Sequence, residues 1–338
     1  MKKHLLFILT LVLLFPLGKT VAQDTHFSQF NQSAMNLNPA NTGRFSGDLR
    51  LAASHRRQWA AIGVPYTTFS VAGDGNLQTI SPAMGRISAG LLLNQDQAGD
   101  GQMKTLEASL QICSRFYLAD DSTSSIRLGI SAGFGQRSVQ FSLLTFDSQF
   151  NGDVFDPLAP IGENPTDNRI GWFDLGTGFT FEKTNDSRHF SFGISAAHLN
   201  RPKQSFYAED VRRPVLWQAH ADYAVPIREN LTFQPSLLFM RQGSYRAAIA
   251  GTELKIPLRE SAVRSLAAGL TLHYRFNDAM VPGFALYMNK FRLGISYDVN
   301  VSGLRRATNG RGGPEFSLVY VARKIKAQPQ RRTVCPVY

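Results

Sequence analysis

Apolar residues alternate with small or polar residues along most of this chain. The clearest run sets Phe291, Leu293, Ile295, Tyr297 and Val299 against Arg292, Gly294, Ser296, Asp298 and Asn300. A period of two is typical of a β-strand with one apolar face and one polar face. No comparable helical period follows residue 23. The pattern therefore predicts an all-β protein.

The same alternation divides the chain into fourteen candidate strands. They lie near 47–58, 66–74, 85–95, 102–116, 125–138, 170–182, 188–199, 214–224, 231–242, 245–256, 264–276, 280–288, 291–300 and 314–323. Strands of soluble proteins average about 5–6 residues, whereas tilted transmembrane strands need about 9–11. Their number is even, as in single-chain outer-membrane barrels. We expect a transmembrane antiparallel up-and-down β-barrel over residues 47–323, with a soluble exported β-protein as the alternative.

The connections between these segments differ in length. If residue 47 enters from the periplasm, the long connections 139–169, 200–213 and 301–313 lie outside, and the short ones 183–187, 225–230 and 289–290 lie inside. Long outer loops and short periplasmic turns are typical of outer-membrane barrels. Aromatic residues near strand ends would form girdles at the two membrane interfaces. These are Trp59, Tyr66, Tyr117, Trp172, Trp217, Tyr223, Tyr274 and Tyr287.

The first residues indicate export. Basic residues precede an apolar run from Leu5 to Phe15, and the small residues Thr20-Val21-Ala22 follow. This order predicts a cleavable signal peptide over residues 1–22. Its removal lowers the formal net charge from +11 to +8. Because the mature chain leaves the cytoplasm, the basic surplus would meet lipid phosphates or an acidic protein rather than nucleic acid.

Two segments lie outside the strand pattern. Residues 23–46 are polar but carry Phe27 and Phe30, so we expect a plug in the lumen or a periplasmic segment. The basic tail, residues 324–338, would remain solvated and bind an acidic surface on a periplasmic protein. Its candidate residues are Lys326, Arg331 and Arg332, while Tyr338 suggests an assembly signal as the alternative.

No catalytic or metal-binding pattern stands out. The Gly-x-Ser-x-Gly match at residues 129–133 lies within a strand, whereas a nucleophile elbow requires a strand-to-helix turn. The seven histidines lack metal-ligand spacing, and Cys113 and Cys335 form no Cys-x-x-Cys pair. We therefore expect neither an enzyme nor a protein with a cofactor or metal.

Several short motifs occur in the order of one family. They are Gln23-Asp24-Thr25-His26-Phe27-Ser28-Gln29-Phe30, Leu37-Asn38-Pro39-Ala40-Asn41-Thr42-Gly43, Arg57-Gln58-Trp59, Asn94-x-Asp96-x-Ala98-Gly99, His198-Leu199-Asn200-Arg201-Pro202, Gln234-Pro235-Ser236-Leu237, Tyr297-Asp298 and Gly313-Pro314-Glu315-Phe316. The chain thus resembles the PorP/SprF family over almost all of residues 23–322. The resemblance implies an outer-membrane barrel of the type IX secretion and gliding apparatus of Bacteroidetes. It also implies two kinds of partner: periplasmic ring and lipoprotein components, and surface proteins with a type B C-terminal sorting domain.

Some of these motifs have simpler interpretations. Asn38-Pro39 forms a plain turn in the local interpretation, and it also resembles the hatch motif of fatty-acid-transporter-like barrels. His198 and Asn200 would end a strand and begin an outer loop. In the long connection 139–169, an apolar surface would fold over the barrel mouth or meet a partner. Its candidate residues are Phe146, Phe150 and Phe155.

These observations lead to two hypotheses. In the first, a monomeric barrel within a larger complex retains a secreted adhesin-like protein at the surface of the outer membrane. In the second, the barrel is a channel for a small apolar solute, with residues 23–46 as its plug.

Overall fold

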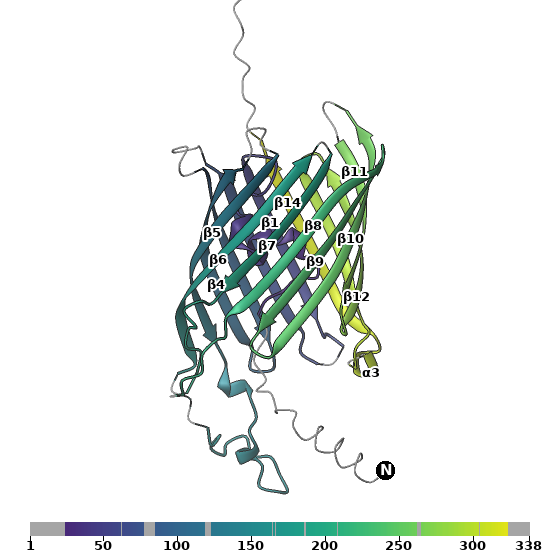
Figure 1. Cartoon of the computed structure of the whole chain (residues 1–338). Helices are drawn as coiled ribbons and strands as arrows, with labels where there is room; N and C mark the ends of the chain where they lie inside the picture. Colours follow the sequence, from purple (N-terminus) through teal and green to yellow (C-terminus); the bar gives the residue numbers. More distant parts are fainter. Residues whose placement is uncertain are drawn as a thin grey trace, which may run out of the picture.

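Fourteen strands form one closed antiparallel barrel in this computed structural model (Figure 1). The structure describes residues 24–323, except 62, 78–84, 119–122, 164, 166, 186, 208, 262–264 and 304. The strands are β1 (Leu49–Gln58), β2 (Tyr66–Asn76), β3 (Arg86–Ala98), β4 (Met103–Tyr117), β5 (Ser124–Ser138), β6 (Arg169–Asn185), β7 (Arg188–Ala197), β8 (Leu216–Arg228), β9 (Leu231–Gln242), β10 (Tyr245–Glu260), β11 (Ser265–Arg275), β12 (Ala279–Met288), β13 (Phe291–Asn300) and β14 (Arg311–Ala322). Each pairs with its neighbours in sequence, and β1 closes the barrel against β14. The predicted fold class is confirmed.

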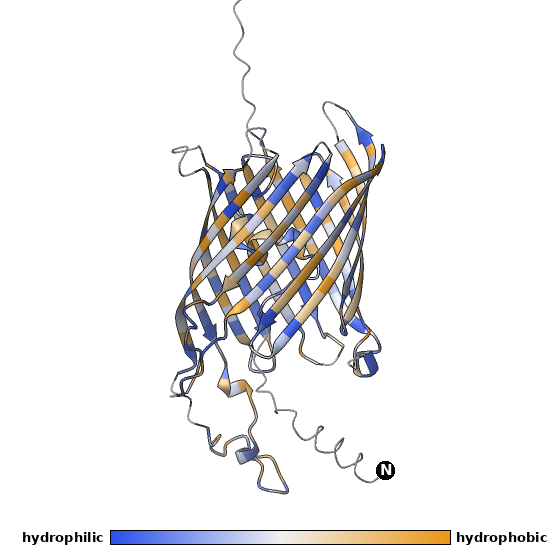
Figure 2. Ribbon diagram, in the orientation of Figure 1, coloured by the Kyte–Doolittle hydropathy of each residue, from blue (hydrophilic) through white to orange (hydrophobic). Residues whose placement is uncertain are grey.

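The alternation in sequence becomes an inside and an outside. Along β13, every second residue from Arg292 to Asn300 is buried, and the residues between them are exposed. The hydropathy colours alternate along the strands in the same way (Figure 2). A barrel with an apolar exterior and a polar interior matches the transmembrane type, in which the exterior faces lipid.

The aromatic girdle was predicted too broadly. Trp217, Tyr117 and Tyr274 are exposed on the outside, but Trp172 faces the lumen, where Arg137 and Arg213 lie over its ring. Tyr287 also faces inward and hydrogen-bonds Glu253. The reason is register: Trp172 precedes the outward Phe173, so the pleat turns its ring into the barrel.

The three longest connections lie at the same end of the barrel. That end carries 139–168, 198–215 and 301–310, and the other end carries the two-residue turns 229–230 and 289–290. We call these the outer and inner ends, because long loops are extracellular in this architecture. The short helices α3 (Arg305–Thr308), η4 (Phe141–Leu143) and η5 (Asp147–Gln149) belong to the outer end. Among the described residues, no helix has the length and hydrophobicity to cross a membrane.

An arginine at the middle of the lipid-facing surface should be costly. Ile295 is 48% exposed near the centre of β13, so Ile295→Arg should destabilise the barrel by about 2–4 kcal/mol. Val299→Arg, near the strand end, should cost about 0–1 kcal/mol. Urea unfolding in lipid vesicles measures both. Equal costs would show that the membrane midplane lies elsewhere.

Candidate functional site: the plugged lumen and its two mouths

Residues 24–46 run through the inside of the barrel, from the outer end to the inner end (Figure 1). Asp24 contacts His198 and Arg213 of an outer connection. At the inner end, Arg323 donates a hydrogen bond of 2.9 Å to the Ser46 carbonyl. Three short turns lie between them: η1 (Phe30–Gln32), α2 (Ala34–Leu37) and η2 (Pro39–Asn41). We call residues 24–46 the luminal segment.

Apolar side chains of the luminal segment pack against the wall. Phe27 and Phe30 are each 3% exposed. Phe30 packs edge-on to the His273 ring, with 5.9 Å between centroids, and joins the buried apolar cluster of the lumen. This cluster contains Phe30, Leu37, Leu216, Leu238, Met240 and Ile249. The two phenylalanines therefore act as packing residues in a mostly polar interior.

Asn38 and Pro39 are buried in the lumen. The Asn38 side chain accepts a 2.8 Å hydrogen bond from the Ala40 amide, which caps η2. It also donates to the carbonyls of Phe179 and Ile194 at 3.0 and 3.2 Å. The motif is thus a turn, as the local interpretation predicts, and it also fastens the segment to β6 and β7.

Two wall glycines permit this close approach. A Cβ atom at Gly178 would lie 1.9 Å from the Asn38 side-chain oxygen. A Cβ atom at Gly129 would lie 2.3 Å from the Ala40 backbone nitrogen. The glycines of β5 and β6 therefore provide the space in which the turn sits, which also explains the false nucleophile-elbow pattern around Gly129.

Carboxylates of β13 and β14 bind the first turn of the luminal segment. Glu315 accepts the backbone N–H groups of Ser28 and Gln29 at 2.8 and 2.7 Å. Asp298 accepts the Ser28 hydroxyl at 2.9 Å. Asp298 also pairs with Arg56 at 2.5 Å and Arg275 at 2.9 Å. This buried network joins β1, β11, β13 and β14 to the segment.

The outer mouth is closed by a second charged group around Asp24. His198 donates a hydrogen bond of 2.6 Å from Nε2 to Asp24 and one of 2.9 Å from Nδ1 to Asp174. Arg213 pairs with both Asp24 and Glu107. Burial by itself lowers the pKa of His198, but Asp24 and Asp174 outweigh it and raise the pKa to about 9. Burial raises the pKa of Asp24, yet Arg213 and His198 hold it well below its usual range.

The outer mouth should therefore loosen in alkaline solution. A protonated His198 stabilises the fold fully below its unfolded pKa of about 6.5. This contribution, of up to about 3 kcal/mol, is lost as the pH rises towards 9. The temperature at which the folded gel band converts to the unfolded band should fall between pH 6.5 and 9.5. His198→Gln should flatten the change, and an equal fall in that variant would assign it to another group.

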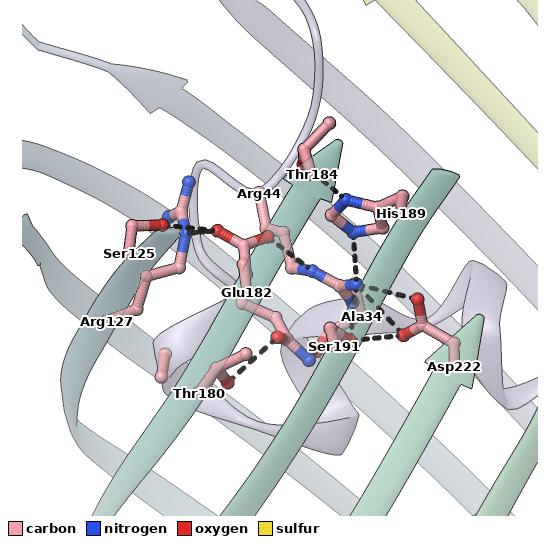
Figure 3. Close-up of polar contacts among 12 residues, drawn as sticks. Ala34, Arg44, Ser125, Arg127, Thr180, Glu182, Thr184, His189, Ser191 and Asp222 are labelled. Carbon is pink, nitrogen blue, oxygen red and sulfur yellow. Dashed lines mark hydrogen bonds and ion pairs between the residues drawn. The ribbon is translucent and has the colours of Figure 1, made fainter. Parts of the chain in front are cut away.

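The inner mouth is held by Arg44 (Figure 3). Its guanidinium donates hydrogen bonds of 2.8 Å to Glu182 on β6 and to Asp222 on β8. The same group donates 2.6 Å to the Ser191 hydroxyl on β7. Glu182 also accepts from Arg127 at 2.7 Å. The luminal segment is thus fastened at its outer end, centre and inner end.

The long outer connection does not fold over the mouth. Residues 139–163 extend away from the barrel (Figure 1), and the Phe141–Phe206 ring contact ties them near their base. Phe150 and Phe155 form a small bridge but remain 54% and 42% exposed, and Phe146 is half-buried. The first of the two expected arrangements is therefore wrong, and the connection presents apolar surface to its surroundings.

Asn200 has a structural role at the end of β7. Its side chain donates a hydrogen bond of 2.7 Å to the Phe173 carbonyl and accepts one of 3.2 Å from the Leu175 amide. Asn200 thereby provides hydrogen-bond partners for the backbone of β6 beyond the point where β7 ends. Outside the described residues lie the predicted signal peptide, residues 1–22, and Lys326, Arg331, Arg332 and Cys335. Cys113 is buried, with its sulfur 3.2 Å from the Ala40 carbonyl oxygen.

Several fastening residues were absent from the sequence-based candidates. They are Asp24, Arg44, Arg56, Glu107, Glu182, Arg213, Asp222, Arg275 and Asp298. The available signal was a charge at a lumen-facing strand position, as at Asp298. Among the described residues, no group of three His, Cys, Asp or Glu side chains is placed to hold a metal ion.

The family model for the type IX secretion system membrane protein PorP/SprF matches residues 20–320. The chain belongs to this family. The plugged barrel described above is thus the form that this PorP/SprF member takes, and the predicted family is confirmed. Together with the barrel fold, the family indicates an outer-membrane protein of a secretion system. No curated protein matches the chain.

Solved structures similar to this PorP/SprF protein are distant in sequence. The toluene transporter TbuX of Ralstonia pickettii is 9% identical, with a TM-score of 0.52 over 86% of this chain and 93% of that one. A FadL homologue of Pseudomonas aeruginosa is 10% identical, with a TM-score of 0.47 over 86% and 94% of the two chains. At this identity, the likeness to TbuX shows the shared barrel fold alone.

Proposed function

We propose that this PorP/SprF barrel retains a secreted surface protein at the outer face of the membrane, while its inner end couples to periplasmic components of the secretion system. The observation that carries the proposal is the fastened luminal segment. It is bonded to strands all around the barrel, from β1 to β14. A filled barrel offers two faces for binding rather than a pore.

The outer face has features that suit a protein partner. A vestibule of 910 Å³ opens there, lined by Trp59, Tyr66 and charged residues of the connection 198–215. At the same end of the barrel, the connection between β5 and β6 exposes Phe150, Val154, Phe155 and Leu158. Exposed apolar groups rimmed by charge are typical of protein interaction sites.

Beyond the outer vestibule, the lumen is less suited to an apolar solute. The cavity between the luminal segment and strands β3–β8 has only 110 Å³. Asp24, Glu107 and Arg213 are among its lining residues. An apolar molecule there would desolvate charged groups without compensating them, which is costly. These features favour the retention hypothesis over the channel hypothesis.

Crosslinking in native outer membranes tests the proposal. The full chain carrying an affinity tag is purified after mild crosslinking, and the bound proteins are identified by mass spectrometry. We expect a secreted protein with a type B C-terminal sorting domain, crosslinked to outer connections, and periplasmic secretion components crosslinked to the inner end. Recovery of neither kind of partner, together with solute-dependent conductance in planar bilayers, would contradict it.

A further inference from the structure

Three arginines form a row across the lumen wall near the inner end. Arg86 on β3 is paired directly with Arg115 on β4, and Arg115 is paired with Arg127 on β5. Like charges placed directly opposite on neighbouring strands destabilise a sheet. The row therefore requires compensation by negative groups.

The luminal wall supplies only part of that compensation. Glu182 lies 2.7 Å from Arg127 and 3.7 Å from Arg115, but it also pairs with Arg44 at 2.8 Å. Figure 3 shows its carboxylate between Arg127 and Arg44. A single carboxylate is thus shared by three guanidinium groups. None of the ion pairs among the described residues involves Arg86, which is exposed.

These arginines line one pocket of 490 Å³. Its wall includes Arg44, Arg86, Arg115 and Arg127, together with Glu182 and residues 43–47 of the luminal segment. Among the described residues, and counting Asp222, which pairs with Arg44, four positive groups face two negative ones. The pocket therefore carries a surplus of positive charge at the end of the barrel that faces the periplasm.

We propose that this inner-mouth pocket binds an acidic peptide segment of a periplasmic protein, with Arg86 and Arg115 as the principal contacts. A guanidinium group presents a planar pair of donors that matches a carboxylate. Glu182 already accepts one hydrogen bond from Arg127 and one from Arg44 in the inner part of the pocket. The outer arginines would receive the carboxylates of the partner.

Size and position favour a peptide over other anions. The volume lies within the range of about 300–1,000 Å³ that is usual for ligand pockets, so a free phosphate ion would leave most of it to water. Because the arginines are on the lumen face of β3–β5, the barrel wall separates them from the lipid headgroups around it. The inference deepens the proposed coupling of the inner end and rests on it.

Binding of a model acidic peptide to the full-length protein tests the pocket. Fluorescein-labelled hexaglutamate is titrated with the protein in non-ionic detergent, and fluorescence anisotropy gives the dissociation constant. The double variant Arg86→Gln/Arg115→Gln should bind at least about tenfold more weakly, and binding to the native protein should weaken with salt. The control Arg212→Gln/Arg246→Gln removes the same charge at the outer end and should change the constant less than about twofold.

Three outcomes would contradict the proposal that the inner-mouth pocket binds an acidic peptide. Unchanged binding in the Arg86/Arg115 variant would place the peptide on another basic region, such as the tail. Equal weakening in both double variants would indicate unspecific attraction to net charge. Competition by inorganic phosphate at the same concentration as the peptide would assign the site to a free anion. Since the assay uses purified protein, its failure leaves the outer-face retention of a secreted protein to be decided by crosslinking.

Discussion

Asp298→Ala is expected to destabilise the folded barrel by about 3–5 kcal/mol, because it leaves two buried guanidinium groups without their shared carboxylate. Arg56 and Arg275 pair with Asp298 at 2.5 and 2.9 Å, and both side chains are at most 3% exposed. The Ser28 hydroxyl loses its acceptor as well. Urea unfolding in lipid vesicles measures the free energy of unfolding.

Asp210→Ala is the matched control. Asp210 also pairs with an arginine, Arg212 at 3.1 Å, but its side chain is 61% exposed. Exposed pairs contribute about 0–1 kcal/mol, so this variant should unfold almost like the native protein. Equal losses in the two aspartate variants would show that the Asp298 network does not hold the luminal segment.

Deleting residues 145–160 should abolish surface retention of the secreted partner while leaving the barrel folded. These residues lie beyond the ring contact of Phe141 at the base of the connection, and they contain the exposed Phe150, Phe155 and Leu158. Removing them takes away the apolar surface without touching a strand. Protease shaving of intact cells measures the retained partner, and the heat-dependent shift of the gel band reports folding.

Substitution distinguishes the apolar surface from the length of the connection. Phe150→Ser/Phe155→Ser keeps the length and removes two rings that are 54% and 42% exposed. It should reduce retention nearly as much as the deletion if the rings contact the partner. Normal retention in the deletion strain would place the partner elsewhere on the outer face.

Strand positions were readable from the sequence because a barrel wall has two chemically different faces. The run from Phe291 to Asn300 gave the limits of β13, and the structure places the same residues on the outside and inside. A strict period of two ties register to the pleat, since a slip of one residue would expose the charged set to lipid. The same alternation places Trp172 inside the barrel, because the next residue, Phe173, faces outward.

The position of the long outer connection could not be predicted from the sequence. The sequence leaves two arrangements for its rings at Phe150 and Phe155, against the mouth or against a partner. Only the structure shows that the connection extends away from the barrel and leaves both rings exposed. Residues in a loop carry no periodicity that relates them to a face. Their direction depends on contacts at the base, such as the Phe141–Phe206 contact.

The sequence by itself determined the strand count and the lipid-facing set, because each depends on residues that are near one another in the chain. It also determined the family, because short motifs occur in that family's order along the chain. The tertiary structure decided how the luminal segment is held. Asp24 meets Arg213, Ser28 meets Glu315 and Arg44 meets Glu182 across separations of 138 to 287 residues. No local pattern specifies such pairs, since closure of the barrel brings distant strands around one segment. The arginine row of β3–β5 likewise exists only through strand register.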